Sequence, residues 1–238
     1  MRYLFTASII TGFILLTLFS VHSFDSINND IGRHIKLGEI IWQTKSVPST
    51  NLFSFTEPDH RFINHHWLSE ILFYFLYLLV GLKGLIVFKT AIIVVSFLIS
   101  FLTLQKIAGL NKDDNKRLIY PVAGFVFLLF IFIFSERTEV RPEIFSFLLF
   151  SIFLSVLLRE KYIGRSRLIW VLPALELLWV NLHIYFFIGF LMILFFAIDR
   201  FFNNSTKERW DKKPLILAGL TGLATLINPN GIAGALYP

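Results

Sequence analysis

Long apolar runs separated by polar stretches dominate this sequence, and several of the runs are long enough to cross a lipid bilayer. Of its 238 residues 55% are hydrophobic and only 16% are charged, with 28 phenylalanines and a mean hydropathy of +0.69. A soluble globular chain has about 25% charged residues. A membrane-spanning helix needs about 20 apolar residues. We therefore expect an all-α fold, a polytopic membrane helical bundle.

We predict about seven transmembrane helices in a single domain over residues 1–238. They cover the ranges 3–21, 85–104, 118–135, 144–158, 168–180, 185–198 and 215–227. The first run has the length of either a signal peptide or a retained helix, and the following VHSF contains no small-residue cleavage site, which favours retention. The chain ends at ALYP just after a predicted turn, so we expect a fragment truncated at its C-terminus.

The first loop, 22–83, is large and carries predicted interfacial helices. Residues 22–66 are polar and must lie in water or at the membrane interface. The apolar segment 67–80 is short for a crossing, is broken by Gly81, and suits a helix on the membrane surface. With that placement 14 of the 22 Lys and Arg residues fall on the side of the N-terminus, which the positive-inside rule assigns to the cytoplasm.

The outer side then collects four polar segments: the first loop, SERTEVRPE at 135–143, NLH at 181–183 and NPNG at 228–231. Ionisable groups at a membrane boundary usually face a cavity or one another, so their convergence predicts a functional site. The net charge of +6 follows from orientation in the membrane and indicates no nucleic-acid partner. The absence of cysteine excludes disulfides and thiolate metal sites.

Asp30, His34 and Gly38 recur at the spacing i, i+4, i+8, which places them on one face of a predicted helix. Asp30 has two interpretations, a helix cap or first-turn charge and a general base that accepts a proton from a hydroxyl group. Asp25, nearer the first span, is the competing candidate base.

The segment PDHRFINHHWLSE contains His65, His66 and Glu70. His66 and Glu70 lie at i, i+4, a spacing compatible with a divalent metal ion. However, adjacent His65 and His66 cannot both face one metal from a regular helix, and histidine is common at membrane interfaces. The metal requirement is left open.

Arg137 and Arg141 alternate with Glu139 and other carboxylates, so internal ion pairs are one interpretation. The other is a lipid phosphate, because a guanidinium group binds phosphate oxygens in a bidentate manner. Both arginines lie on the predicted outer side, where basic residues are rare.

Glu176 lies inside an apolar span and shares a helix face with His183. It is either a functional carboxylate or a protonated, hydrogen-bonded one. Asn181 and His183 could bind phosphate or sugar hydroxyls, or cap helix ends. Asn228 belongs to a predicted turn, NPNG, whether or not it also binds substrate.

The strings DIGRHIKLGEII, VPSTNLFSFTEPDHRFINHHWLSEIL, RPEIFSFLLF, WVNLH and INPNG resemble those of a group of bacterial membrane proteins with the architecture of the GT-C superfamily of integral-membrane glycosyltransferases. The resemblance covers nearly the whole chain. It implies transfer of a sugar from a polyprenyl-phosphate carrier to a glycan, lipid or protein acceptor on the outer face of the bacterial cytoplasmic (inner) membrane. In that scheme Asp30 is the base, aided by His34, and Arg137 and Arg141 hold the phosphate.

The chain departs from the GT-C pattern in having Asn28 and Asn29 before Asp30 rather than a second acidic residue, which argues against a metal held by paired carboxylates. Two other functions fit the sequence. One is a transporter or flippase for a lipid-linked solute, with Glu176 lining the path. The other is a catalytically inert membrane scaffold, in which the outer charges form only ion pairs.

Overall fold

The computed structural model describes residues 2–21, 30–57, 59–110, 124–129, 131–132, 139–164, 166–203 and 212–238. Over these ranges the chain is all-α, as predicted. Its β pairing there is limited to an isolated antiparallel bridge between Thr50 and Arg61.

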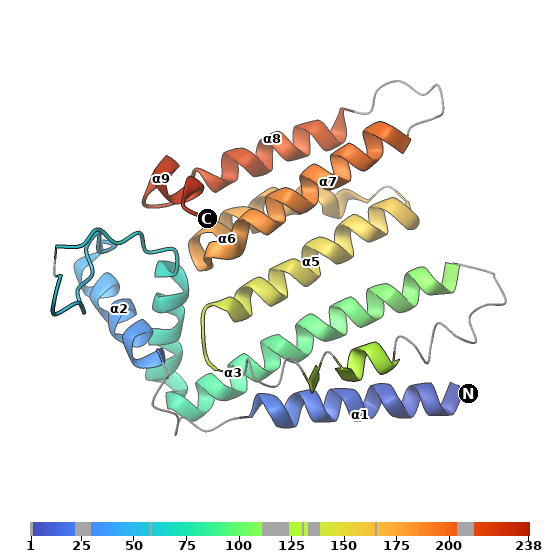
Figure 1. The fold of residues 1–238 in the computed structure, drawn as a ribbon, viewed down its shortest axis with the longest axis horizontal. Helices are drawn as coiled ribbons and strands as arrows, with labels where there is room; N and C mark the ends of the chain where they lie inside the picture. Colours follow the sequence, from blue (N-terminus) through green and yellow to red (C-terminus); the bar gives the residue numbers. More distant parts are fainter. Residues whose placement is uncertain are drawn as a thin grey trace.

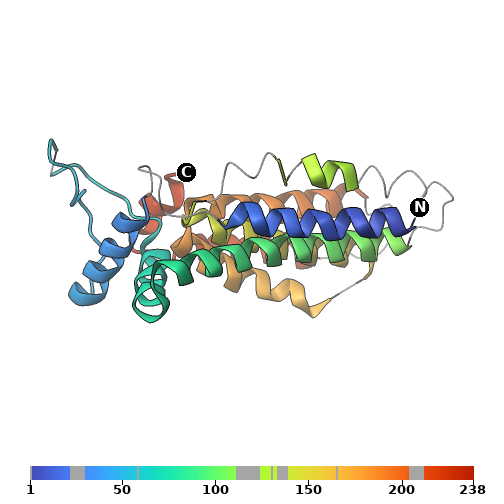
Figure 2. The same cartoon turned by 90° about the horizontal axis from the view of Figure 1, so that it is seen from below.

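Long helices run side by side along the longest axis of the molecule, and a smaller helical layer lies across one end (Figures 1 and 2). The lengthwise helices are α1 (Arg2–Ser20), the second part of α3 (Trp67–Leu110), α5 (Glu143–Tyr162), α6 (Leu172–Leu182), α7 (Phe187–Asn203) and α8 (Lys213–Thr225). The layer across the end consists of α2 (Ile31–Thr44) and the first part of α3. Short turns η1 (Arg167–Val171) and η2 (Ile184–Phe186) precede α6 and α7, and α9 (Gly231–Leu236) follows α8.

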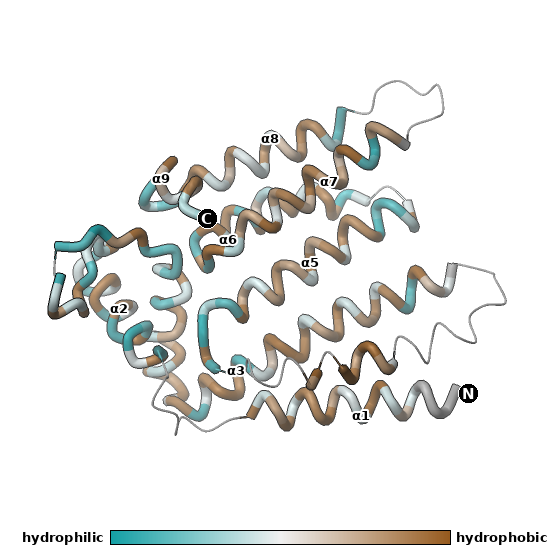
Figure 3. Tube along the Cα trace, in the orientation of Figure 1, coloured by the Kyte–Doolittle hydropathy of each residue, from teal (hydrophilic) through white to brown (hydrophobic). Residues whose placement is uncertain are grey.

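The second part of α3, α5 and α7 run away from this layer, whereas α1, α6 and α8 run towards it, so the polar segments between them gather at two opposite ends (Figures 1 and 3). One end, here called the site end, carries α2, the start of α5 and the C-terminal ends of α6 and α8. The other, here called the basic end, carries the N-terminus and the C-terminal ends of α5 and α7. Described basic side chains at the basic end include Lys106, Arg159, Lys161, Arg200, Lys212 and Lys213.

The predicted break after residue 80 is confirmed, because Gly81 interrupts α3 with φ 65° and ψ −170°. Positive φ is unfavourable for residues with a Cβ atom and is readily adopted by glycine. The break separates the short first part, which lies beside α2, from the long second part (Figure 1).

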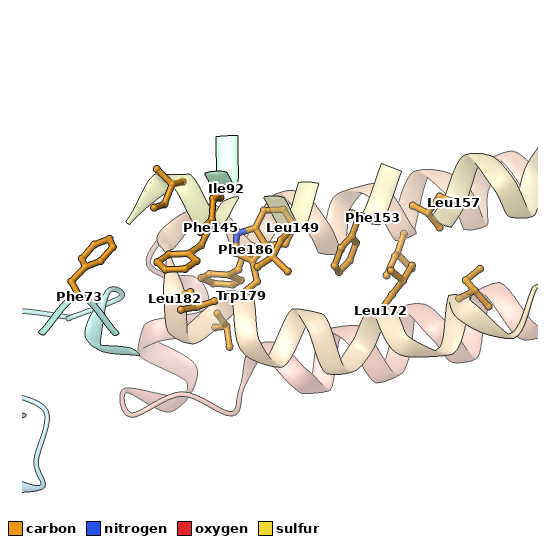
Figure 4. Close-up of a cluster of buried hydrophobic side chains, with 14 of the residues drawn as sticks. Phe73, Ile92, Phe145, Leu149, Phe153, Leu157, Leu172, Trp179, Leu182 and Phe186 are labelled. Carbon is orange, nitrogen blue, oxygen red and sulfur yellow. The ribbon is translucent and has the colours of Figure 1, made fainter. Parts of the chain in front are cut away.

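The hydrophobic core joins α3, α5, α6 and α7 (Figure 4). Phe153 and Trp179 are fully buried, and their rings meet edge to face with centroids 5.4 Å apart. Such aromatic pairs add packing energy beyond the apolar area they bury. This core fixes the end of α6 relative to the start of α5, and both of these segments contribute to the site end.

Two of the described helical segments, Trp67–Gly109 and Ile184–Phe202, are long and apolar enough to cross a membrane. Thr6–Ser20 and Lys213–Thr225 are apolar but shorter. The number of seven spans therefore remains a prediction. Most of the predicted span 118–135 lies outside the described residues.

Gly38 on α2 marks the closest approach between α2 and α3, because a Cβ atom there would overlap the backbone carbonyl of Glu70. Backbone cannot move aside as a flexible side chain can, so Gly38→Ala is expected to destabilise the protein by about 1–3 kcal/mol. Gly32 on the same helix has no atom within 4 Å of a built Cβ, and Gly32→Ala is expected to be neutral or to stabilise by up to about 1 kcal/mol. Unfolding of both variants in detergent micelles measures the difference, and equal stabilities would contradict this account of the α2–α3 contact.

Candidate functional site

The site end brings together side chains from four parts of the sequence. The Trp67 indole Nε1 donates to Asn181 Oδ1 at 2.8 Å, and Asn181 Nδ2 donates to the Ile227 carbonyl at 2.9 Å. The rings of His65 and Tyr237 lie 4.9 Å apart. The predicted convergence of the first loop with the segment 181–183 is therefore confirmed, and Ile227, the residue before the segment 228–231, lies in contact with both through Asn181.

Asp30 lies at the N-cap position of α2, but its side chain makes no capping hydrogen bond. Its Oδ2 lies 3.7 Å from Nη2 of Arg141, which comes from the turn before α5. The side chains of Asp30 and Arg141 are 49% and 38% exposed, so the pair is open to solvent and to a ligand. An exposed pair at this distance contributes little stability, and the two groups can separate at low cost.

Arg141 also contacts Glu139, with 2.6 Å between Nη2 and Oε2. The ion-pair interpretation of Arg141 is thus confirmed. Its Nε is nevertheless buried and makes no hydrogen bond within the described residues. A guanidinium N–H that is free of partners among the described residues is a donor suited to a phosphate or carboxylate oxygen. Arg137 and Asp25, the other candidates of these segments, lie outside the described residues.

His34 contacts Glu70, although the sequence spacing had placed it within reach of Asp30. His34 Nδ1 and Glu70 Oε1 are 3.1 Å apart, and both side chains are buried. The second carboxyl oxygen of Glu70 accepts a hydrogen bond of 2.6 Å from Nδ2 of Asn64. Asn64 Oδ1 in turn accepts from the backbone N–H of His66 at 2.9 Å. Glu70 therefore holds α2 and the 64–66 segment in place, and its own backbone carbonyl makes the close contact with Gly38.

His66 lies between two anchored imidazoles. Its ring centroid is 5.9 Å from that of His34 and 5.1 Å from that of His183, to which it is nearly parallel. His183 Nδ1 lies 2.8 Å from Ser146 Oγ, which accepts a hydrogen bond of 2.8 Å from the Trp179 indole. Two histidine nitrogens in this group, Nδ1 of His66 and Nε2 of His65, are buried without a hydrogen-bond partner in the described part of the chain.

Burial favours the neutral forms of His65, His66 and His183. It lowers the pKa of His66 to about 2 and the pKa of His183 to about 4, and it lowers the pKa of His65 as well. The pKa of His66 is lowered further, to a smaller extent, by electrostatic interaction with its basic neighbours, which are His183, His34, His65 and Arg33. At neutral pH the imidazoles can accept or donate a hydrogen bond to a sugar hydroxyl without carrying charge.

The metal hypothesis finds no geometric support among the described residues. Both carboxyl oxygens of Glu70 contact other side chains, and no group of three or more His, Asp or Glu side chains is placed to hold an ion there. His60, also in this segment, is exposed and lies 3.4 Å from Glu57.

Asn181 and Asn228 serve the fold. Asn181 uses both amide atoms, on Trp67, Ile227 and the Leu177 carbonyl. Asn228 closes its own turn by donating to two backbone carbonyls and accepting from the N–H of Asn230. For both residues the structural interpretation accounts for the contacts observed.

Glu176 lies within the bundle and apart from the exposed Asp30–Arg141 pair. It is fully buried, and its carboxyl group lies against the backbone N–H of Phe190 on α7. A Cβ atom at Gly189 of α7 would overlap Glu176 Oε2, so the carboxyl group lies directly against the α7 backbone.

The contributors to the site that the sequence analysis missed include Asn64, Ser146 and Trp179. Asn64 adjoins the paired histidines and could have been included on that basis. Ser146 lies in the apolar run IFSFLLF, and nothing in the local sequence links it to His183, 37 positions away.

No protein family model, curated protein or solved structure matches this chain.

Proposed function

We propose that this protein is a membrane-embedded glycosyltransferase that moves a sugar from a polyprenyl-phosphate carrier to an acceptor hydroxyl at the site end. The observation that carries the proposal is the pairing of Asp30 with Arg141. A carboxylate and a guanidinium group from segments more than 100 residues apart meet at an exposed position, at the start of the helix that carries His34. Transfer from a lipid phosphate requires these two kinds of group, a base for the acceptor and a cation for the leaving phosphate.

The proposed setting is a multi-pass protein of the bacterial inner membrane, with the site end outside. The apolar segments Trp67–Gly109 and Ile184–Phe202 support membrane insertion. The basic residues gathered at the end that carries the N-terminus support a cytoplasmic location for that end. A carrier lipid in the outer leaflet would then present its phosphate at the level of Arg141.

In the proposed reaction Asp30 removes the proton from the acceptor hydroxyl as its oxygen attacks the anomeric carbon. The new glycosidic C–O bond forms while the bond from the anomeric carbon to the phosphate oxygen breaks, which inverts the anomeric configuration. The electron pair of the broken bond leaves with polyprenyl phosphate, whose growing negative charge Arg141 stabilises. The proton remains on the Asp30 carboxyl until water removes it.

The buried contacts of Glu70 with His34 and Asn64 hold Asp30 in position. Glu70 on α3 binds His34 on α2 and Asn64 in the loop before α3. It therefore fixes α2, the helix whose N-cap is Asp30. We assign His34 to positioning, since it is buried against Glu70 and its side chain contacts the helix layer rather than the exposed pair.

A transporter of lipid-linked solutes is the second candidate, and Glu176 is the observation that favours it. A fully buried carboxyl group inside the bundle could change protonation state during transport. Proteoliposomes containing the protein and radiolabelled polyprenyl-phosphate hexoses separate the candidates. Label found in a new glycoside supports transfer; label moved across the bilayer on an unchanged carrier, and blocked in Glu176→Gln, supports transport. If folded protein shows neither transfer nor transport, the catalytically inert scaffold is the remaining function.

Arg141→Gln is expected to lower kcat/KM for the lipid donor by about 10- to 100-fold, the loss typical of a hydrogen bond to a charged group. Arg141→Lys should recover only part of it, because an ammonium group keeps the charge but lacks the guanidinium fork. Lys36→Gln is the matched control, since Lys36 is an exposed cation on α2 whose partner is Glu39. Equal rates for Arg141→Gln and Lys36→Gln would remove Arg141 from the phosphate site.

A further inference from the structure

A groove between α5 and α7 opens at the basic end, far from the site end. It has a volume of about 290 Å³. Its apolar lining comes from both helices: Leu154, Leu157, Leu158, Met192, Phe195 and Phe196. Leu157 and Phe196 are buried and form its floor, whereas Phe195 is 64% exposed.

Charged groups lie at one end of the groove only. Lys161 and Asp199 complete the lining, with Lys161 Nζ 2.9 Å from the Asp199 carboxylate. The Arg200 guanidinium lies 5.4 Å from the ring centroid of Phe196, and its Nη2 donates to the Glu160 carbonyl at 3.1 Å. Two cations and one carboxylate therefore border the mouth, and the rest of the lining is apolar.

We propose that this groove binds an anionic phospholipid, with one acyl chain on the apolar lining and the phosphate beside Lys161 and Arg200. The groove is apolar along most of its length and has a net positive charge at one end. This matches a molecule with a negatively charged head group and a hydrocarbon tail. Charge complementarity thus identifies the occupant as a lipid of the basic side of the membrane. The inference rests on the proposed membrane location but not on the proposed transfer reaction.

Asp199 and Lys161 are expected to affect the binding of an anionic lipid in opposite directions. The Asp199 carboxylate lies beside Lys161 and repels an incoming phosphate, so removing its charge should strengthen binding of an anionic lipid. Removing the charge of Lys161 should weaken the same binding. A purely structural ion pair would make both variants less stable without changing lipid preference in opposite directions.

Native mass spectrometry of the full chain, released from mixed micelles of phosphatidylglycerol and phosphatidylcholine, measures the preference. We expect the wild type to retain phosphatidylglycerol about fivefold over phosphatidylcholine, Lys161→Gln to lose that preference, and Asp199→Asn to increase it by about fivefold. Leu158→Trp, which fills the groove, should reduce retention of both lipids. Lys106→Gln, which removes an exposed charge from α3 outside the groove, is the control and should match the wild type.

Three outcomes would overturn the proposal. One is equal retention of the two lipids by the wild type. The second is an unchanged preference in both Lys161→Gln and Asp199→Asn. The third is full competition by inorganic phosphate, which would show that the apolar groove contributes nothing. Circular dichroism of each variant confirms that its helices are intact, and sugar transfer by the site end should be unaffected by Lys161→Gln.

Discussion

Asp30→Asn is expected to lower the rate of sugar transfer by about 10²- to 10⁴-fold, the contribution usual for a general base. The amide has nearly the same shape as the carboxylate but cannot accept the proton of the acceptor hydroxyl. Asp30 makes no capping hydrogen bond and has a half-exposed side chain, so the substitution should leave stability almost unchanged. The measurement is single-turnover transfer with saturating lipid donor, which isolates the chemical step from donor binding and product release.

Glu39→Gln is the control for Asp30→Asn, because Glu39 is a carboxylate on the same helix that contacts Lys36. It should transfer at the wild-type rate. A rate for Asp30→Asn within a few-fold of the wild type would exclude Asp30 as the base, even if the protein proves to be a transferase.

Acidification is expected to destabilise the protein through His66 and His183. Folding lowers the pKa of these groups from about 6.5 to about 2 and about 4, so the folded state favours their neutral forms. The unfolded chain binds more protons at acid pH. Their contribution is therefore fully present above pH ~6.5 and is lost progressively as pH falls towards the folded-state values.

The expected loss from His183 alone reaches about 3 kcal/mol at the lower end of this range, from ~1.4 kcal/mol per pKa unit. Thermal unfolding in detergent as a function of pH measures it. Replacing the titrating ring in His66→Gln should flatten the acid side of the profile. His60→Gln, which removes an exposed histidine, should not. Identical pH profiles for His66→Gln and His60→Gln would contradict the assignment of acid sensitivity to the buried cluster.

The sequence was enough to predict the parts of this architecture that depend on local properties. The break at Gly81 follows from a glycine within an apolar run, and the gathering of polar segments at one end follows from the fact that apolar helices run the length of the molecule in both directions. The proximity of Arg141 to carboxylates was also predictable from its neighbours.

The contacts of His34 and His183 were not predictable, because they depend on how helices pack. His34 meets Glu70 only because α2 approaches the first part of α3 closely at Gly38. Similarly, Ser146 reaches His183 only because the aromatic core holds α5 against α6. Sequence spacing places residues on a face of one helix and cannot assign their partners on another.

The most direct test of the central claim is an NMR measurement of one round of reaction in proteoliposomes supplied with an anomerically pure polyprenyl-phosphate hexose labelled with ¹³C at the anomeric carbon. The proposal predicts a new glycoside of inverted configuration and an equal amount of free polyprenyl phosphate, both absent with Asp30→Asn. Retention of configuration would contradict direct displacement with Asp30 as base, and an unchanged donor in the presence of folded wild-type protein and a range of acceptors would contradict the assignment as a glycosyltransferase.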